Sequence, residues 1–233
     1  MPAYFVTGTD TDAGKTLVTT GLLALARRRG LSTLGLKPIA SGCEPTADGL
    51  RNADALALQA QCAPAQPYAA INPFAFEPAI APHLAARRAG VALGLDDLVD
   101  PLRPMLALER GLTLVEGAGG WRVPLNDDED LTGLAGRLGL PVILVVGLKL
   151  GCLSHARLTA EAIVADGQPL AGWVGNLLDP AFASDRELYR DNLATLTHRL
   201  PGPCLGVVPR LAARSPRALA EAAADHLVLP DVD

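Results

Sequence analysis

Lysine is scarce in this sequence of 233 residues. Only three of its 20 basic residues are lysines, Lys15, Lys37 and Lys149, and the others are arginines. Because arginine fills basic positions almost everywhere, each remaining lysine indicates a place that needs a compact point charge, which a planar guanidinium cannot replace. All three lie at the end of an expected strand or in the loop after it, which in an open α/β sheet is the ligand-binding edge.

Other absences narrow the class of protein. The four cysteines are widely spaced without a Cys-x-x-Cys pair, and the four histidines show no zinc spacing. These are the unpaired thiols of a reducing cytoplasm, not a disulfide framework or a metal site. The most apolar stretch, residues 141–153, contains Lys149 and is too short to cross a bilayer. The net charge of -5 gives no indication of nucleic acid, and the first strand begins too early for a signal peptide.

The sequence instead alternates strands and helices. Hydrophobic residues make up 49% of the chain and aromatic residues 4%, which is typical of a helix–sheet sandwich. Strands are expected at residues 3–6, 33–37, 112–116, 141–146, 170–176, 205–208 and, shorter, 227–229. Helices are expected at 17–29, 52–62, 84–88, 95–108, 131–138, 154–164, 184–200 and 216–224, with an irregular proline-rich loop at 64–82. We therefore predict a single α/β domain, residues 1–233, with a doubly wound, mainly parallel sheet and helices on both faces.

A glycine-rich loop after the first strand carries the clearest motif, Gly8-Thr-Asp-Thr-Asp-Ala-Gly-Lys-Thr16. A strand, such a loop and a helix in this order predict a phosphate-binding loop, in which backbone N–H groups converge on an anion. Lys15 adds charge near the β- and γ-phosphates, and the Thr16 hydroxyl is placed to bind Mg²⁺. The loop is one residue longer than the common version. The alternative is a glycine-rich turn without a ligand.

Further candidates follow the second and third expected strands. Lys37 and Ser41 come after one strand, beside the phosphate loop if the strands are neighbours, although a surface lysine with a solvated ammonium is the alternative. Asp54 is either functional or a helix first-turn residue favoured by the dipole. Glu116 ends an apolar strand, where a carboxylate is unfavourable unless it is paired or bound to metal. In phosphate-loop enzymes this position usually serves Mg²⁺, and a salt-bridged strand end is the alternative.

Two candidates lie in the second half of the chain. Lys149 follows the most apolar strand and precedes a helix whose free N–H groups suit a carboxylate or phosphate, or it belongs to an ordinary connection. Asn176 ends a strand, where its amide either recognises an adenine edge or caps the next loop.

Six segments taken together resemble dethiobiotin synthetases. They occur in the order of that family, over most of the chain, at residues 8–16, 37–42, 49–58, 115–121, 144–152 and 171–176. Agreement is weakest at 64–110 and after 210. The resemblance implies a phosphate-loop NTPase fold, a homodimer, a cytoplasmic location, ATP and Mg²⁺. It implies a ligase of biotin biosynthesis that forms dethiobiotin from diaminopelargonate and CO₂ through a carbamate and a carbamic–phosphoric anhydride.

The resemblance also assigns roles to residues of this sequence. It implies catalytic residues Lys15, Lys37, Thr11 and Ser41, and metal ligands Thr16, Asp54 and Glu116. It implies nucleotide-binding residues Asp12, Ala13, Gly14, Lys15, Thr16, Leu17, Glu116, Gly117, Ala118, Gly119, Asn176, Val208 and Pro209. It implies substrate-binding residues Ser41, Lys149, Gly151, Cys152, Leu153 and Tyr189, those from 151–153 and Tyr189 coming from the other subunit. Asp12 stands where family members often carry Glu, which shortens its reach.

Two other functions are compatible with a phosphate loop. A switch ATPase of the partitioning or septum-placement type acts on partner proteins, but it typically has a second lysine early in the loop, and residues 9–13 contain none. A related amide-forming ligase of the cobyrinate type usually carries a glutaminase domain, for which this chain has no length.

Overall fold

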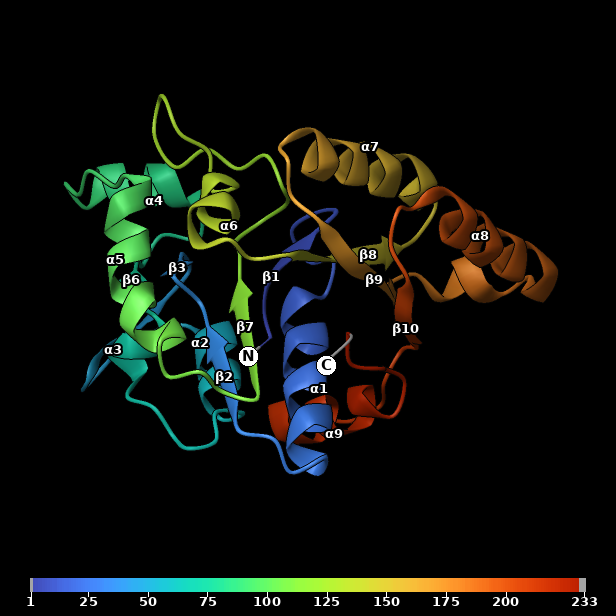
Figure 1. The fold of residues 1–233 in the computed structure, drawn as a ribbon, viewed down its shortest axis with the longest axis horizontal. Coiled ribbons are helices and arrows are strands. Elements are labelled where there is room, and N and C mark those ends of the chain that lie inside the picture. The colour runs from blue at the N-terminus through green and yellow to red at the C-terminus, as the bar shows by residue number, and fades with distance from the viewer. Residues whose placement is uncertain (1, 231–233) are drawn as a thin grey trace.

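A computed structural model describes residues 2–230. Its centre is a parallel six-stranded sheet with the strand order β10-β9-β8-β1-β7-β2 (Figure 1). The strands are β1 (Ala3–Gly8), β2 (Thr33–Leu36), β7 (Leu112–Glu116), β8 (Val142–Leu148), β9 (Leu170–Leu177) and β10 (Cys204–Val208). Every residue of β8 is buried, as expected for a central strand covered by helices on both faces. The predicted fold class is confirmed.

The chain reverses its direction of winding at β1. From β1 it proceeds to β2 and β7 on one side, and from β8 to β9 and β10 on the other. Ligands bind at such a switch point, outside the carboxyl ends of the strands. The glycine-rich loop that follows β1 lies at this point.

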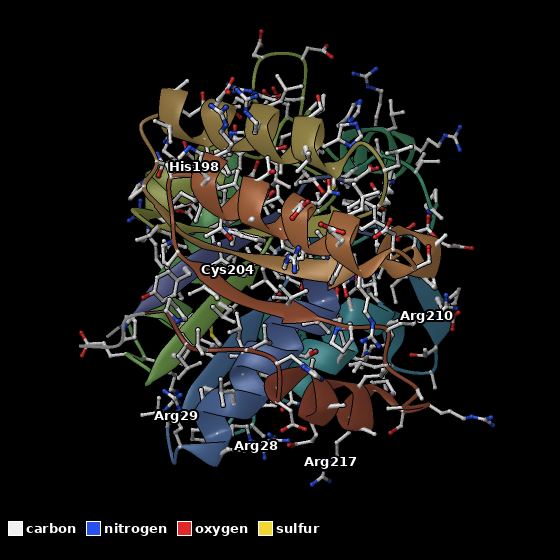
Figure 2. All side chains as sticks on the ribbon, turned by 90° about the vertical axis from the view of Figure 1, so that its right-hand side faces the viewer. Arg28, Arg29, His198, Cys204, Arg210 and Arg217 are labelled. Atoms are coloured by element: carbon white, nitrogen blue, oxygen red, sulfur yellow. The ribbon has the colours of Figure 1, made fainter. Side chains whose placement is uncertain are left out.

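Helices cover both faces of the sheet (Figure 1). The helices α1 (Lys15–Arg28), α2 (Ala53–Gln59) and α9 (Pro216–Ala224) lie on one face, and α5 (Leu95–Leu106), α6 (Gly133–Leu138), α7 (Cys152–Ala165) and α8 (Arg186–Arg199) on the other. Arg28, labelled in Figure 2, joins the end of α1 to Glu221 of α9 and to Asp225 just after it, at 2.7 Å and 2.6 Å. The chain also forms the short helices α4 (Pro82–Arg88) and η1 (Pro180–Ala183).

The structure corrects two predictions. The segment 64–82 is not irregular throughout, because it contains α3 (Tyr68–Ile71) and β6 (Phe74–Ala75), and β6 pairs with β3 (Ile39–Ala40). A hairpin of β4 (Glu44–Thr46) and β5 (Gly49–Arg51) was likewise not expected. The strand predicted at 227–229 is reduced to one bridge between Gly206 and Leu227, because the chain leaves the sheet after that single pair.

Candidate active site

The glycine-rich loop connects β1 directly to α1, which begins at Lys15. Gly14 precedes the helix with a φ of 95°, in the left-handed region that favours glycine. A Cβ at this position would overlap the side-chain amide of Asn176. Asp12 has a φ of 60°, which Asp adopts more readily than most residues. The turn therefore directs the free N–H groups of the first turn of α1 toward an anion.

Lys15 is buried beside this turn, and its ammonium donates to the Asp10 carbonyl at 3.2 Å. Burial lowers the pKa of Lys15, and the neighbouring charge of Lys37 lowers it further. An anion placed near this lysine would restore the charge balance, so the arrangement favours binding of a phosphate group.

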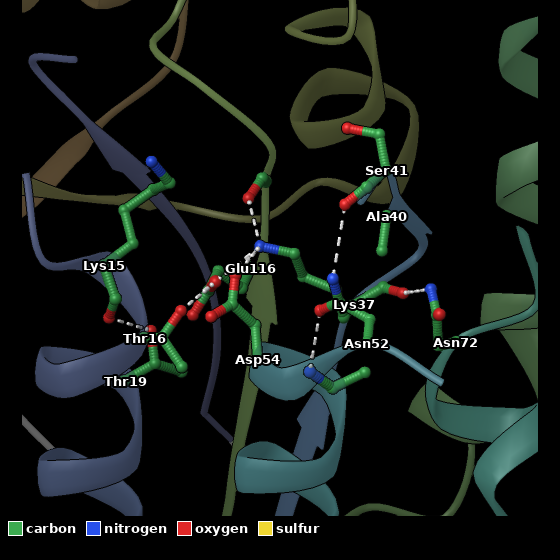
Figure 3. Close-up of polar contacts among 12 residues, drawn as sticks. Lys15, Thr16, Thr19, Lys37, Ala40, Ser41, Asn52, Asp54, Asn72 and Glu116 are labelled. Carbon is green, nitrogen blue, oxygen red and sulfur yellow. Dashed lines mark hydrogen bonds and ion pairs between the residues drawn. The ribbon is translucent and has the colours of Figure 1, made fainter. Parts of the chain in front are cut away.

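Lys37 is the centre of a buried ion-pair cluster (Figure 3). Its ammonium lies 2.7 Å from Glu116 Oε1 and 3.2 Å from Asp54 Oδ2, and it donates to the Gly117 carbonyl at 3.2 Å. The side chain of Lys37 is 5% exposed and that of Glu116 is fully buried. Strands β2 and β7 are neighbours, and this adjacency brings Lys37 and Glu116 together although they are far apart in sequence.

The charges around Lys37 keep it protonated. Burial alone would lower the pKa of the ammonium, but the charges and hydrogen bonds of Glu116 and Asp54 outweigh burial and raise it. The alternative of a solvated surface lysine is thereby wrong, because the side chain is 5% exposed, and the functional role predicted for Lys37 stays a proposal.

Oxygen atoms around Glu116 fit a divalent cation. Glu116 Oε2 is buried and has no hydrogen-bond partner among the described residues, whereas Oε1 accepts from the Thr16 hydroxyl at 2.8 Å. The Asp54 side chain is 46% exposed and lines a cavity that also contains Thr16 and Lys37. Mg²⁺ takes few protein ligands, all oxygen, and keeps several waters. No cluster of three or more His, Cys, Asp or Glu suited to a metal occurs in the described part of the chain.

A cavity of about 360 Å³ lies against these groups. Predicted site residues from the glycine-rich loop, from β2 and the loop after it, from α2 and from the loop after β7 meet there. Its lining residues are Thr11, Asp12, Gly14, Lys15, Thr16, Leu17, Lys37, Ala40, Ser41, Asn52, Asp54, Ala118 and Gly119.

Asn176, Val208 and Pro209 form a second group beside the glycine-rich loop. Asn176 pairs in register with Val208 across β9 and β10, and Pro209 follows directly. The Asn176 amide donates to the Ala13 carbonyl at 3.0 Å. These residues are thus adjacent to one another and to the loop, but they are not part of the cavity lining.

The remaining predicted substrate residues lie elsewhere. Lys149 forms an exposed ion pair with Asp10 of the loop at 3.5 Å. The segment 151–153 begins α7, and Tyr189 lies on α8, where its ring contacts Phe182. None of these five residues lines the cavity, as far as the structure describes the chain.

Sequence reasoning did not single out Asn52, Tyr68 and Asn72. Asn52 caps α2 by accepting from the Ala55 N–H at 3.2 Å, and Asn72 donates to the Lys37 carbonyl at 2.7 Å (Figure 3). The only sequence signal was the position of Asn52 ahead of a helix, which is typical of a cap.

The fold and this site define a phosphate-loop nucleotide-binding protein. Solved structures with a similar fold include the MinC:MinD cell division complex of Aquifex aeolicus (11% identity, TM-score 0.57, covering 99% of this chain and 87% of that one). Another is the septum site-determining protein MinD of Pyrococcus horikoshii (14%, TM-score 0.52, 95% and 94%). At such identity the likeness concerns the fold alone. The AAA domain family matches residues 2–218.

Sequence relatives identify the family. An ATP-dependent dethiobiotin synthetase BioD of Chromohalobacter salexigens is 71% identical over 234 residues, covering 99% of both chains. Proteins of the same name from Pseudomonas aeruginosa (62%, 94% and 95% covered) and Cellvibrio japonicus (58%, 97% and 96%) are also similar. The chain belongs to the ATP-dependent dethiobiotin synthetase family and is therefore a ligase, which confirms the resemblance.

Proposed function

We propose that this protein closes the ureido ring of dethiobiotin from 7,8-diaminononanoate (diaminopelargonate), CO₂ and ATP, with Mg²⁺, in biotin biosynthesis. Membership of the family supports this assignment. The single structural observation that carries it is the buried Lys37 ammonium, which faces the same cavity as the glycine-rich loop and is held by two carboxylates. That cavity joins a phosphate-binding element to a fixed positive charge, as carboxyl activation by ATP requires.

The proposed chemistry proceeds on the substrates. One substrate amine adds to CO₂ and loses a proton, which gives a carbamate. A carbamate oxygen attacks the γ-phosphorus and the bond to ADP breaks, giving a carbamic–phosphoric anhydride. The second amine attacks the carbamoyl carbon, loses a proton and expels phosphate. Each step is largely a matter of position and charge stabilisation.

Residues of this chain divide these tasks. Lys15 and the N–H groups at the start of α1 bind phosphates, and Lys37 stabilises the carbamate and the transferring phosphoryl group. Thr11 and Ser41, which line the cavity, donate hydrogen bonds from their hydroxyl groups to the substrate. Asn176, Val208 and Pro209 form the adenine site, and Asp12 with 117–119 borders the nucleotide.

The cation is assigned to oxygen atoms of Thr16, Asp54 and Glu116. Bound Mg²⁺ would supply neutralisation of phosphate charge. Support comes from the unpartnered Oε2 of Glu116 and from the exposed carboxylate of Asp54. Cation binding would also compete with the Lys37 ammonium for these carboxylates, which frees that charge for substrate.

The substrate site is proposed to be shared in a homodimer located in the cytoplasm. Residues 151–153, with Lys149, would receive the substrate carboxylate, and Tyr189 would complete the site from the partner subunit. Support comes from their not lining the cavity of their own chain and from Leu150, which is 91% exposed. No helix among residues 2–230 is long and apolar enough to cross a membrane.

The test is product formation by the purified protein. ADP release and dethiobiotin mass are measured with ATP, Mg²⁺, diaminopelargonate and bicarbonate, and again with each component omitted. We expect ADP and dethiobiotin in equal amounts, with loss of both when any component is missing. A switch ATPase would release ADP without the diamine, and ADP release that is indifferent to the diamine would refute the proposal.

A further inference from the structure

A partly buried polar network connects the two segments that carry the ion-pair cluster. It consists of Asn52 at the start of α2, Tyr68 in α3 and Asn72 directly after α3. The Tyr68 hydroxyl donates to Asn72 Oδ1 at 3.0 Å and accepts from the Asn52 N–H at 2.8 Å. Neither Tyr68 nor Asn72 lines the cavity, so both would act through other residues.

Asn72 holds the main chain of Lys37. Its side-chain amide donates to the Lys37 carbonyl at 2.7 Å and to the Phe74 carbonyl at 3.2 Å, which uses both amide hydrogens. The Lys37 N–H donates to the Ile71 carbonyl at 2.8 Å. Both main-chain polar groups of Lys37 are therefore bonded to the C-terminal end of α3, one to its last residue and one to the residue that follows it, and Asn72 is itself buried.

Asn52 holds the other side of the cluster. It accepts from the Ala55 N–H at 3.2 Å and so fixes the first turn of α2, which carries Asp54. Its amide donates to the Ser41 carbonyl at 3.3 Å (Figure 3). Asn52 thus sets the position of a carboxylate that pairs with Lys37 and of a residue that lines the cavity.

The Tyr68 hydroxyl contacts both asparagines and so joins these two halves behind the Lys37–Asp54 ion pair. Its ring is fixed separately by Arg51, whose guanidinium carbon lies 4.3 Å from the ring centre. A lysine side chain has four rotatable bonds, so its charge is well placed only if its main chain and its partners are fixed together.

We propose that Tyr68 and Asn72 are positioning residues for the proposed reaction, which fix Lys37 relative to Asp54 through Asn52. This inference rests on the proposed function of Lys37. Loss of the Tyr68 hydroxyl leaves the ring and its contact with Arg51 in place and removes only the two hydrogen bonds to Asn52 and Asn72.

The test compares Tyr68→Phe with Gln59→Met. Gln59 is the matched control because its amide donates to the Gln66 carbonyl at 2.9 Å, which joins α2 to the same part of the chain outside the network. With only three lysines in the chain, ¹⁵N-lysine labelling gives three ammonium signals, and Lys37→Met and Lys149→Met variants identify them.

In Tyr68→Phe we expect the Lys37 ammonium signal to shift and the Lys149 signal to stay. We expect kcat to fall about three- to tenfold, the effect of one lost buried hydrogen bond, and KM for ATP to stay within about twofold. Gln59→Met should lower Tm about as much as Tyr68→Phe does, but it should leave the Lys37 signal and kcat unchanged.

Three results would overturn the inference. One is an unchanged Lys37 signal in Tyr68→Phe, and another is a shifted signal with normal kcat. The third is an equal fall in kcat in Gln59→Met, which would mean that general loosening of the segment is responsible. Failure of the wild-type protein to form dethiobiotin would instead refute the proposed function, because the lysine signals are read without turnover.

Discussion

Lys37 and Lys149 both lie close to the glycine-rich loop but differ in their surroundings. Lys37 is buried and holds two carboxylates at 2.7 Å and 3.2 Å, while Lys149 is 41% exposed and pairs with Asp10 at 3.5 Å. Strong desolvation makes the Lys37 cluster specific in geometry, whereas an exposed pair such as Lys149–Asp10 contributes little to folding free energy.

The same contrast holds for the surroundings of each lysine. The ion-pair cluster around Lys37 is assembled within one chain, because strands β2 and β7, the cap of α2 and the Asn72 amide hold its residues. Leu150, next to Lys149 in the chain, is 91% exposed, and helices α7 and α8 also leave apolar side chains exposed, with Leu158 63% and Leu188 57% exposed. We infer that the phosphate chemistry is preassembled by one chain and that the recognition of the organic substrate depends on a second copy.

Replacement of Lys37 should produce the largest effect. We expect Lys37→Gln to lower kcat by about a hundred- to a thousand-fold, because the contact with the transferring group is made mainly in the transition state. Lys37→Arg should fail nearly as badly, since a planar fork cannot fit a point-charge site between two carboxylates. Turnover and ATP affinity are measured side by side.

The control is Lys149→Arg, which changes a half-exposed lysine in the same way. It should keep most of its turnover, and ATP affinity should survive in all three variants because Lys15 is unchanged. A Lys37→Arg variant with near-normal turnover would show that the two lysines are equivalent, and the contrast between the two regions would be lost.

Within the Lys37 side, Glu116 and Asp54 should differ. Glu116 is fully buried and Asp54 is 46% exposed, so water can replace Asp54 more easily as a ligand. We expect the Mg²⁺ concentration that gives half-maximal turnover to rise about a hundredfold in Glu116→Gln and about tenfold in Asp54→Asn, within the range of altered metal sites. Magnesium titrations of the initial rate measure both.

Tm separates metal binding from folding in these variants. Glu116→Gln also removes a buried charge that pairs with Lys37, which costs about 3 kcal/mol in typical cases, so its assays are run well below its Tm. Unchanged Mg²⁺ dependence at full activity in Glu116→Gln would remove this residue from the metal site.

The proposal that a second copy completes the substrate site is tested by mixing subunits. A Lys15→Met protein and a Tyr189→Ala protein, each inactive, should recover about a quarter of wild-type activity after exchange, because half of the dimers are mixed and each contains one intact shared site. Subunit exchange is verified with differently tagged chains. Absence of recovery after complete exchange would show that each chain completes its own site.

The sequence predicted the parts of the fold that depend on local patterns. The apolar run of β8 and the glycine-rich loop before α1 are continuous in sequence, so periodicity and spacing reveal them. The fold class and the family are confirmed. The structure also brings together Lys37 and Glu116, which end neighbouring strands, and Asp54, which only the resemblance placed with them. Their roles stay proposals.

The segment 64–82 was not predictable in the same way. Helix α3 has four residues and β6 has two, too few for a period, and β6 exists because Phe74 pairs with Ile39 far away in sequence. Asn72 and Tyr68 gave no signal because their partners, the Lys37 carbonyl and the Asn52 N–H, become neighbours only in the folded chain.

The smallest effect concerns how the two buried lysines influence stability. The pKa of Lys15 is lowered in the folded state, so its charge opposes folding at neutral pH, and this penalty disappears as pH rises toward the ordinary value of 10.5. The pKa of Lys37 is raised, so its charge supports folding below 10.5 and this support is lost as pH rises through the higher folded value.

Lys15→Met should therefore raise the free energy of unfolding at pH 7 by about 1 kcal/mol, and with it Tm, as often occurs when a strained functional residue is removed. Lys37→Met should lower Tm at pH 7, and its deficit should shrink above pH 10.5. Melting curves without ligand measure both, and ATP should raise the Tm of the wild type but not of Lys15→Met, because a bound ligand stabilises the folded state. A fall in Tm in both variants at pH 7 would mean that Lys15 is held as firmly as Lys37, against the contrast in their partners.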